Sequence, residues 1–148
     1  MVDAMASTGI NTGRPYGQAL AQLRESGLRP TRQRLALARL LLDGRDRHVS
    51  AEQLHEEAEK QGVRVSLATV YNTLHQFTAV GLLREVVIDP NRSYFDTNVT
   101  AHHHFFVEDD GRLLDIPADE IDVDRLPTPP EGTEIKRVEV VVRLRNRK

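Results

Sequence analysis

Residues 66–74 read Ser66-Leu67-Ala68-Thr69-Val70-Tyr71-Asn72-Thr73-Leu74, and this stretch decides the fold. Serine is a residue type that caps helix N-termini, and apolar residues then recur at helical spacing from Leu67 to Val80, where Gly81 supplies a stop. The other face carries hydrogen-bonding side chains in place of the lysine and glutamate of an ordinary solvent-exposed face. These side chains are Thr69, Asn72, Thr73 and Gln76, with Tyr71 near the start of the helix.

Three shorter helices are expected before this stretch. The first begins at Tyr16 and ends at Gly27, and the second follows Pro30 and Thr31 and ends at Asp43-Gly44. The third begins at Ser50, which has the spacing of a capping box with Gln53, and it ends near Gly62. Residues 1–15 are small and polar with little to bury, so they are expected to form a disordered arm.

After Gly81 the apolar period changes from that of a helix to that of a strand. Residues 82–88 and 93–96 read as two strands around the turn Asp89-Pro90-Asn91-Arg92. Several helices followed by a β-hairpin indicate a winged helix, here expected over 16–96. In that architecture the last helix enters the DNA major groove, where polar side chains can contact base edges.

The remainder of the chain reads as a second, smaller module over 101–146. Residues 104–107 and 113–116 predict a hairpin around Asp109-Asp110-Gly111, and residues 135–144 alternate well enough for one more strand. The four prolines between 117 and 130 preclude a long helix there. So few elements make a poor core, and pairing with a second copy is therefore expected. The expected fold is α+β, with a winged-helix domain followed by a small α/β dimerisation domain.

Composition excludes several classes of protein. The chain has no cysteine, which rules out disulfides, thiolate zinc sites and a cysteine nucleophile. It also lacks a long apolar run or a signal peptide, so a cytoplasmic protein without membrane contact is expected. The net charge of −2 is unevenly distributed, with 12 Lys/Arg against 9 Asp/Glu over residues 14–94 and 8 against 12 over residues 95–148. The first part is therefore the candidate for contacting phosphates.

Residues 18–116 resemble the ferric uptake regulator (Fur) superfamily, motif by motif. The resemblance is carried by the strings 28–34 (LRPTRQR), 48–52 (HVSAE) and 66–74 (SLATVYNTL). It implies binding of double-stranded operator DNA through Tyr71, with Arg32 and Arg34 at backbone-contacting positions. Ser66, Thr69 and Asn72 complete the expected DNA-binding set. Asn72 stands where many relatives carry arginine, so different bases are expected to be preferred.

The triplet His102-His103-His104 falls where the family has a His-His-Asp-His sequence followed by a cysteine pair. Val107 and Asp110 occupy the cysteine positions, so the family's structural zinc site is absent. This version is similar to the iron response regulator (Irr) branch. The resemblance implies an iron- or haem-responsive regulator of iron homeostasis and haem synthesis genes, acting as a homodimer or higher oligomer. A Fur-type repressor that senses zinc, manganese or peroxide is the alternative.

The histidine triplet also predicts a metal site directly. Successive strand residues point to opposite faces, so His102 and His104 can converge on one ion while His103 faces away. Matched to the family's inter-domain site, His48 and Asp96 complete a set suited to iron, manganese or zinc. His103 is the candidate axial ligand for haem, flanked by Phe105 and Phe106.

Less specific readings stand beside these. The triplet can be a surface histidine cluster, His48 can hydrogen-bond a neighbour, and the two phenylalanines can be ordinary core residues. Tyr71 can bury its ring against the helix, and Arg32 and Arg34 can form a solvated face. A metal-dependent hydrolase using the histidines with Asp96 or Asp122 has no phosphate loop or paired nucleophile to support it, so an enzyme is not expected. A metal-free protein-interaction module is the third possibility.

Overall fold

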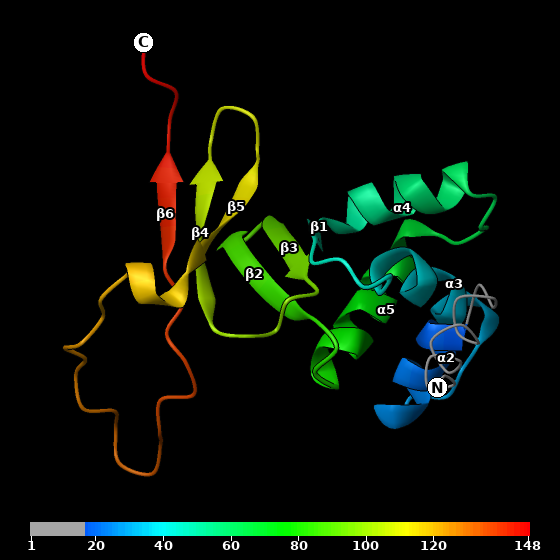
Figure 1. Ribbon diagram of the computed structural model, residues 1–148, viewed down its shortest axis with the longest axis horizontal. Helices are drawn as coiled ribbons and strands as arrows, with labels where there is room; N and C mark the ends of the chain where they lie inside the picture. The colour runs from blue at the N-terminus through cyan, green and yellow to red at the C-terminus, as the bar shows by residue number, and fades with distance from the viewer. Residues whose placement is uncertain (1–16) are drawn as a thin grey trace, which may run out of the picture. The chain divides into compact units, whose positions relative to one another are not determined.

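The computed structural model describes residues 17–148, and the predicted disordered arm over 1–15 lies outside the described residues. The chain divides into two compact units, one ending at Val99 and the other running from Thr100 to Lys148. The first is helical with a small sheet, and the second is built on a sheet, as Figure 1 shows. The α+β class predicted from the sequence is therefore confirmed.

Four helices form most of the first unit, and the N-termini of α4 and α5 are capped by the serines that the sequence predicts. Ser50 and Gln53 form a complete capping box, and the Ser66 side chain accepts a hydrogen bond from the Thr69 N–H. These bonds satisfy backbone donors that a helix leaves unpaired at its first turn. The helices are α2 (Gly17–Glu25), α3 (Arg32–Leu41), α4 (Ala51–Lys60) and α5 (Leu67–Ala79).

The wing of the first unit is a three-stranded antiparallel sheet in the order β1-β3-β2. Its strands are β1 (His48–Val49), β2 (Arg84–Asp89) and β3 (Arg92–Asp96). The two-residue strand β1 was not predicted from the sequence. It adds to the edge of the hairpin and so joins the loop before α4 to the wing.

One apolar core holds the first unit together. Leu37, Leu54, Leu74, Phe77 and Phe95 have no exposed surface, and they come from α3, α4, α5 and β3. Burying side chains of this size stabilises a fold by roughly 1.5–3 kcal/mol each. The apolar face of α5 is thus fixed inward, which leaves its polar face turned outward.

The second unit contains a three-stranded sheet in the order β5-β4-β6 (Figure 1). Strands β4 (His102–Val107) and β5 (Leu113–Pro117) form an antiparallel hairpin. A short 3₁₀ helix, η1, follows at Ala118–Glu120, and β6 (Val141–Leu144) pairs parallel with β4. The predicted strand over 135–144 was too long, because β6 covers only its last four residues. None of the helices that the structure describes in 17–148 has the length and apolar character of a membrane span.

Candidate functional site

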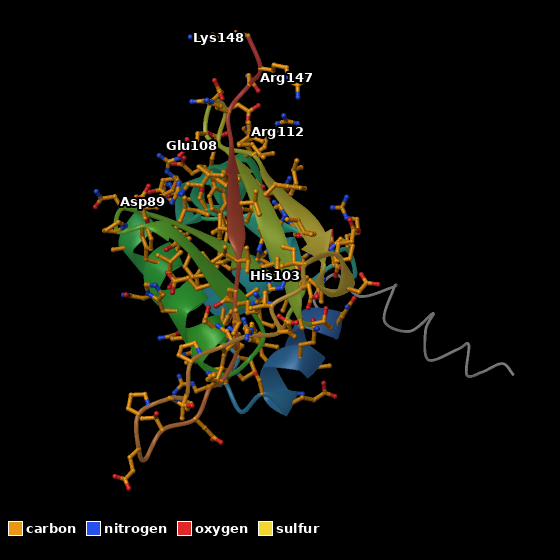
Figure 2. All side chains as sticks on the ribbon, turned by 90° about the vertical axis from the view of Figure 1, so that its left-hand side faces the viewer. Asp89, His103, Glu108, Arg112, Arg147 and Lys148 are labelled. Atoms are coloured by element: carbon orange, nitrogen blue, oxygen red, sulfur yellow. The ribbon has the colours of Figure 1, made fainter. Side chains whose placement is uncertain are left out.

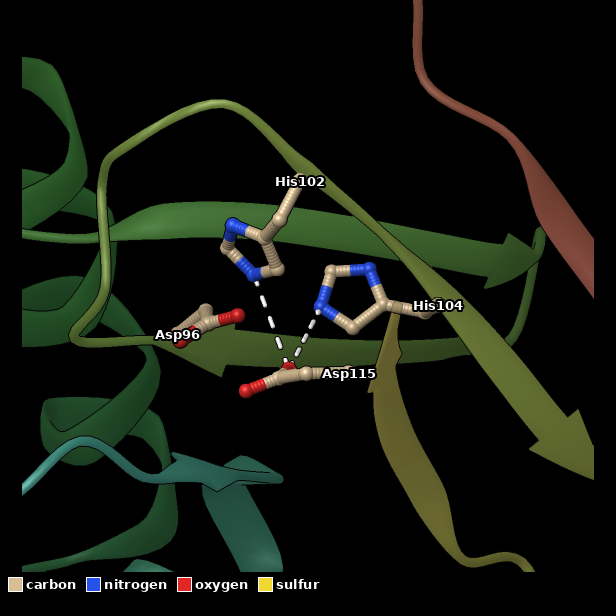
Figure 3. A group of neighbouring side chains, drawn as sticks. All are labelled: Asp96, His102, His104 and Asp115. Carbon is tan, nitrogen blue, oxygen red and sulfur yellow. Dashed lines mark ion pairs between the residues drawn. The ribbon is translucent and has the colours of Figure 1, made fainter. Parts of the chain in front are cut away.

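Three side chains of the second unit converge on one point beside the β4–β5 hairpin. Nε2 of His102 and Nε2 of His104 lie 3.6 and 3.4 Å from the same carboxylate oxygen, Oδ1 of Asp115 (Figure 3). The two imidazoles are stacked edge to face, with ring centroids 4.6 Å apart. Both histidines are buried, whereas the Asp115 side chain is 45% exposed. The two imidazoles are therefore shielded from solvent, whereas the carboxylate is accessible to it.

A backbone contact fixes which nitrogen of His102 carries the proton. Its Nδ1 lies 2.7 Å from the carbonyl oxygen of Thr100, and a carbonyl can only accept a hydrogen bond. Nδ1 is therefore protonated, and in the neutral imidazole the lone pair is on Nε2, the atom that faces Asp115. Metal-binding histidines are commonly oriented in this way, by donating the second ring N–H to a backbone carbonyl.

The separations within this cluster fit a metal ion. Bonds of about 2.0–2.2 Å from a tetrahedral ion to nitrogen and oxygen place neighbouring ligand atoms about 3.3–3.6 Å apart. The two nitrogen–oxygen distances to Asp115 fall in that range. The ligand atoms of all three residues lie within 4.8 Å of one another. Two imidazoles and a carboxylate, without sulfur, suit zinc, manganese or ferrous iron.

Asp115 is a candidate ligand that the sequence analysis missed. It faces His104 directly across the hairpin, as its Cα partner in the register of β4 and β5. That register is set by the turn, in which the Gly111 N–H donates to the Val107 carbonyl and Gly111 has a φ of +76°. Centring the predicted hairpin on Asp110 would instead place residue 116 opposite His104. A shift of one residue thus decides whether an aspartate or an isoleucine stands there.

The two other predicted ligands, His48 and Asp96, lie in the first unit and are neighbours there. They are Cα partners across β1 and β3, so their side chains leave the sheet on the same face. Arg84 of β2 is the partner of Asp96 on its other side. Asp96 is buried and His48 is half-buried. Figure 3 also draws Asp96, at the end of β3.

His103 faces away from the His102–His104 pair and is engaged differently. The backbone N–H of Val140 donates to its Nδ1 at 3.0 Å, beside the start of β6 (Figure 2). Because Nδ1 accepts this bond, the proton of the neutral ring is on Nε2. A haem ligand needs the opposite arrangement, with the lone pair on the outward nitrogen. Of the two phenylalanines beside it, Phe106 is a core residue and Phe105 is half-buried.

The polar face of α5 begins at its cap. The Ser66 hydroxyl donates to Oγ1 of Thr69 (2.9 Å) while its oxygen accepts the Thr69 N–H (3.1 Å). The hydroxyl hydrogen of Thr69 is not used in either bond. Asn72 and Gln76 are exposed one and two turns further along, on the same side of the helix, whereas Thr73 is buried.

Tyr71 is packed partly against the core and reaches α4 with its hydroxyl. The hydroxyl donates to Oε2 of Glu52 at 2.9 Å. This hydrogen bond, together with burial and the carboxylate charge, raises the pKa of Tyr71 above its usual value. The phenol is consequently a protonated donor at neutral pH, with its single hydrogen directed to Glu52.

Of the two predicted backbone-contacting arginines, Arg34 is fixed between two helices and Arg32 is exposed at the start of α3. Nε and Nη2 of Arg34 both donate to Oε1 of Gln76, at 3.2 and 3.1 Å, and Nη1 donates to the Arg29 carbonyl at 2.8 Å. A polar groove runs between these helices. Its lining side chains are those of Arg29, Thr31, Gln33, Arg34, Thr69, Asn72, Thr73 and Gln76.

A winged-helix unit with an outward polar helix, followed by a sheet unit with a cluster of histidine and carboxylate side chains, is the architecture of a DNA-binding regulator with a candidate metal site. A family model described as "Ferric uptake regulator family" matches residues 25–143. The chain belongs to the ferric uptake regulator family. Regulators of this family bind operator DNA as dimers, through a helical N-terminal part and a C-terminal β-sheet dimerisation domain.

Individual relatives agree with this assignment. The chain is 30% identical over 105 residues to the peroxide-responsive repressor PerR of Staphylococcus epidermidis, covering 71% of this chain and 69% of the relative. It is similar to the ferric uptake regulator of Pseudomonas aeruginosa solved with manganese, at 30% identity and a TM-score of 0.66, covering 86% of this chain and 97% of that one. The Vibrio cholerae ferric uptake regulator has the same fold, with a TM-score of 0.66 at 21% identity, over 85% and 98% of the two chains.

Proposed function

We propose that this protein is a Fur-type repressor whose binding to operator DNA depends on a divalent metal held by His102, His104 and Asp115. The convergence of two Nε2 atoms on one oxygen of Asp115 carries the proposal. Two imidazole nitrogens that face one carboxylate oxygen form a ligand set that a divalent cation can bridge. Manganese is the first metal to test, because the 30% identical regulator from Pseudomonas aeruginosa was solved with it. Zinc and ferrous iron suit the same ligands.

Asp96 and His48, the ligands expected from the sequence, are proposed to complete the set. Asp96 is buried at the end of the wing and His48 is its cross-strand partner, so both can act together from the first unit. A metal held by ligands from both units would favour one arrangement of the two DNA-binding helices α5 in a dimer over others. Binding free energy that differs between arrangements shifts their populations, and this is the proposed switch.

The DNA-binding surface is proposed to be the polar face of α5 with the start of α3. Thr69 and Asn72 line the groove and supply hydrogen-bond donors and acceptors there. Tyr71 and Ser66 lie at the N-terminal end of α5. Arg32 and Arg34 supply positive charge beside them. Uncharged polar side chains on an exposed helix face are among the groups that contact base edges in the major groove.

The metal proposal is tested by substituting the one ligand that can be changed without disturbing the core. Asp115→Asn keeps the shape of a side chain that is 45% exposed and removes its charge. We expect the affinity for manganese or zinc, measured by calorimetry, to fall at least tenfold. The metal concentration needed for half-maximal operator binding should rise by the same factor. Asp119→Asn, exposed on η1, is the matched control and should bind metal like the wild type. Equal metal affinity in the two variants would refute the site.

The iron response regulator reading, with haem bound by His103, is the second candidate. It is supported by the cysteine-free histidine triplet. Against it stands the hydrogen bond from Val140 to Nδ1 of His103, which leaves the proton on Nε2. Haem binding at His103 would need this bond to break. Titration of wild type and His103→Gln with haem, read by absorption and by operator gel shift, separates the two: a haem-dependent release that disappears in His103→Gln supports the haem response.

A further inference from the structure

The side-chain amide of Gln76 has a defined orientation, although it is exposed. Arg34 approaches it with two N–H groups, from Nε and Nη2, and both donate to the same atom. A guanidinium has five donors and no acceptor, so the atom that it faces must be the amide oxygen. The amide NH₂ of Gln76 therefore points away from Arg34, with both of its hydrogens unused by this contact.

This orientation matters because of where Gln76 lies. Thr69, Asn72 and Gln76 follow one another at helical spacing along the groove face of α5, and Gln76 is the last of them. A glutamine that reads adenine uses both amide atoms, accepting from N6–H and donating to N7. With its oxygen taken up by Arg34, Gln76 can offer only donors. Guanine presents two neighbouring acceptors, O6 and N7, and cytosine presents a donor that would oppose the NH₂ group.

We propose that Arg34 is a positioning residue that sets base specificity by locking Gln76 as a donor, so that the base read by Gln76 is guanine rather than adenine. The inference rests on the proposed DNA-binding function and assigns one of its contacts. It also changes the role of Arg34, which the sequence predicts as a phosphate contact. Three of its N–H groups are used within the protein, one of them on the Arg29 carbonyl, so its primary partners are α5 and the segment before α3.

The two roles of Arg34 predict different results. A phosphate contact supplies affinity without sequence information, so its loss weakens binding to all sequences alike and reduces the salt dependence. A positioning residue changes which base is preferred. In Arg34→Met the Gln76 amide can rotate, which restores the bidentate adenine contact. Arg32→Met removes the same charge from the same helix without touching Gln76 and is the matched control.

The experiment is selection of operator sequences from a random duplex library by the full-length wild type, Arg34→Met, Arg32→Met and Gln76→Glu. We expect the wild type to prefer guanine at one symmetric pair of positions. Arg34→Met should shift that pair toward adenine by roughly fivefold or more, the size of one bidentate base contact. Gln76→Glu presents only acceptors and should favour cytosine there. Arg32→Met should keep the wild-type preference at lower affinity.

The outcomes that overturn the inference differ from those that overturn the proposed function. A wild type that selects no sequence refutes DNA reading altogether. A wild type that selects a sequence, with Arg34→Met and Arg32→Met losing affinity equally and keeping every base preference, shows that Arg34 only contacts phosphate. An unchanged preference in Gln76→Glu shows that Gln76 reads no base. Either of the last two results refutes the inference and leaves the regulator assignment standing.

Discussion

At the scale of single residues, neighbouring histidines on β4 have opposite hydrogen-bonding roles. His102 donates from Nδ1 to a carbonyl, and His103 accepts at Nδ1 from a backbone N–H. The first arrangement leaves Nε2 with the lone pair that a metal needs, while the second uses the lone pair to hold the start of β6. Backbone partners, which no side-chain pattern reveals, thus separate a candidate ligand from a structural residue.

Tyr71 gives a prediction at the same scale. Its only hydroxyl hydrogen is directed to the Glu52 carboxylate, so donation to a DNA acceptor requires this bond to be given up. Removing the charge with Glu52→Gln weakens the competing bond and removes a negative group from the DNA-facing side. Charge-assisted hydrogen bonds are about 1 kcal/mol stronger than neutral ones, so operator affinity should rise roughly fivefold.

Fluorescence anisotropy with labelled operator measures this change. Glu56→Gln removes the same charge one turn further along α4, where Glu56 pairs with Lys60 at 3.4 Å, and it should leave affinity close to that of the wild type. If Glu52→Gln instead binds operator more weakly than Glu56→Gln, the carboxylate holds Tyr71 in its binding position and does not compete with DNA.

At the scale of elements, the helices and the two hairpins could be predicted because their signals are local. Caps such as Ser50 and Ser66 act within three residues, and apolar spacing identifies the buried face of a helix. Strand β1 could not be predicted, because two residues carry no periodicity and the strand exists only through pairing with β3. Likewise, residues 135–140 alternate like a strand but precede β6, which begins at Val141.

The candidate site follows the same division. His102 and His104 could be found because their spacing along one strand places them on one face. Identifying Asp115 as a ligand required the register of the β4–β5 hairpin. The Arg34–Gln76 contact joins residues 42 positions apart in the sequence. Contacts of that separation depend on how helices pack, which the sequence of either helix alone does not determine.

The two capping serines give the prediction at this scale. Ser50→Ala and Ser66→Ala each remove a side-chain acceptor from a first-turn N–H, and each should lower the free energy of unfolding by about 1 kcal/mol. Only Ser66 caps the proposed reading helix and hydrogen-bonds Thr69 on its polar face. Urea unfolding should therefore show similar losses, while operator affinity falls severalfold in Ser66→Ala alone. Equal affinities would mean that Ser66 acts only as a cap.

At the scale of the whole molecule, apolar burial is unevenly divided between the two units. The apolar core cluster found in the described part of the chain consists of residues from the first unit. The buried apolar residues of the second unit are Phe106, Val107, Leu113 and Ile116, while Leu126 and Ile135 are among its exposed ones. A sheet with so small a core needs a covering partner, in keeping with a family whose members bind DNA as dimers.

Ile135 tests whether the exposed apolar side chains of the second unit face a second copy. Ile135→Glu would bring a carboxylate into that interface, and burying an unpaired charge costs more than the ~1.4 kcal/mol that changes an equilibrium tenfold. Sedimentation equilibrium should therefore show the dimer dissociation constant rising at least tenfold.

Val87→Glu is the matched control. It places the same charge on an exposed valine of β2 in the first unit and should leave the dimer intact. A palindromic operator is bound by both copies of α5 in the dimer at once. Ile135→Glu should therefore also lose far more operator affinity than Val87→Glu. A dimer that withstands Ile135→Glu but dissociates in Val87→Glu would place the pairing surface on the wing.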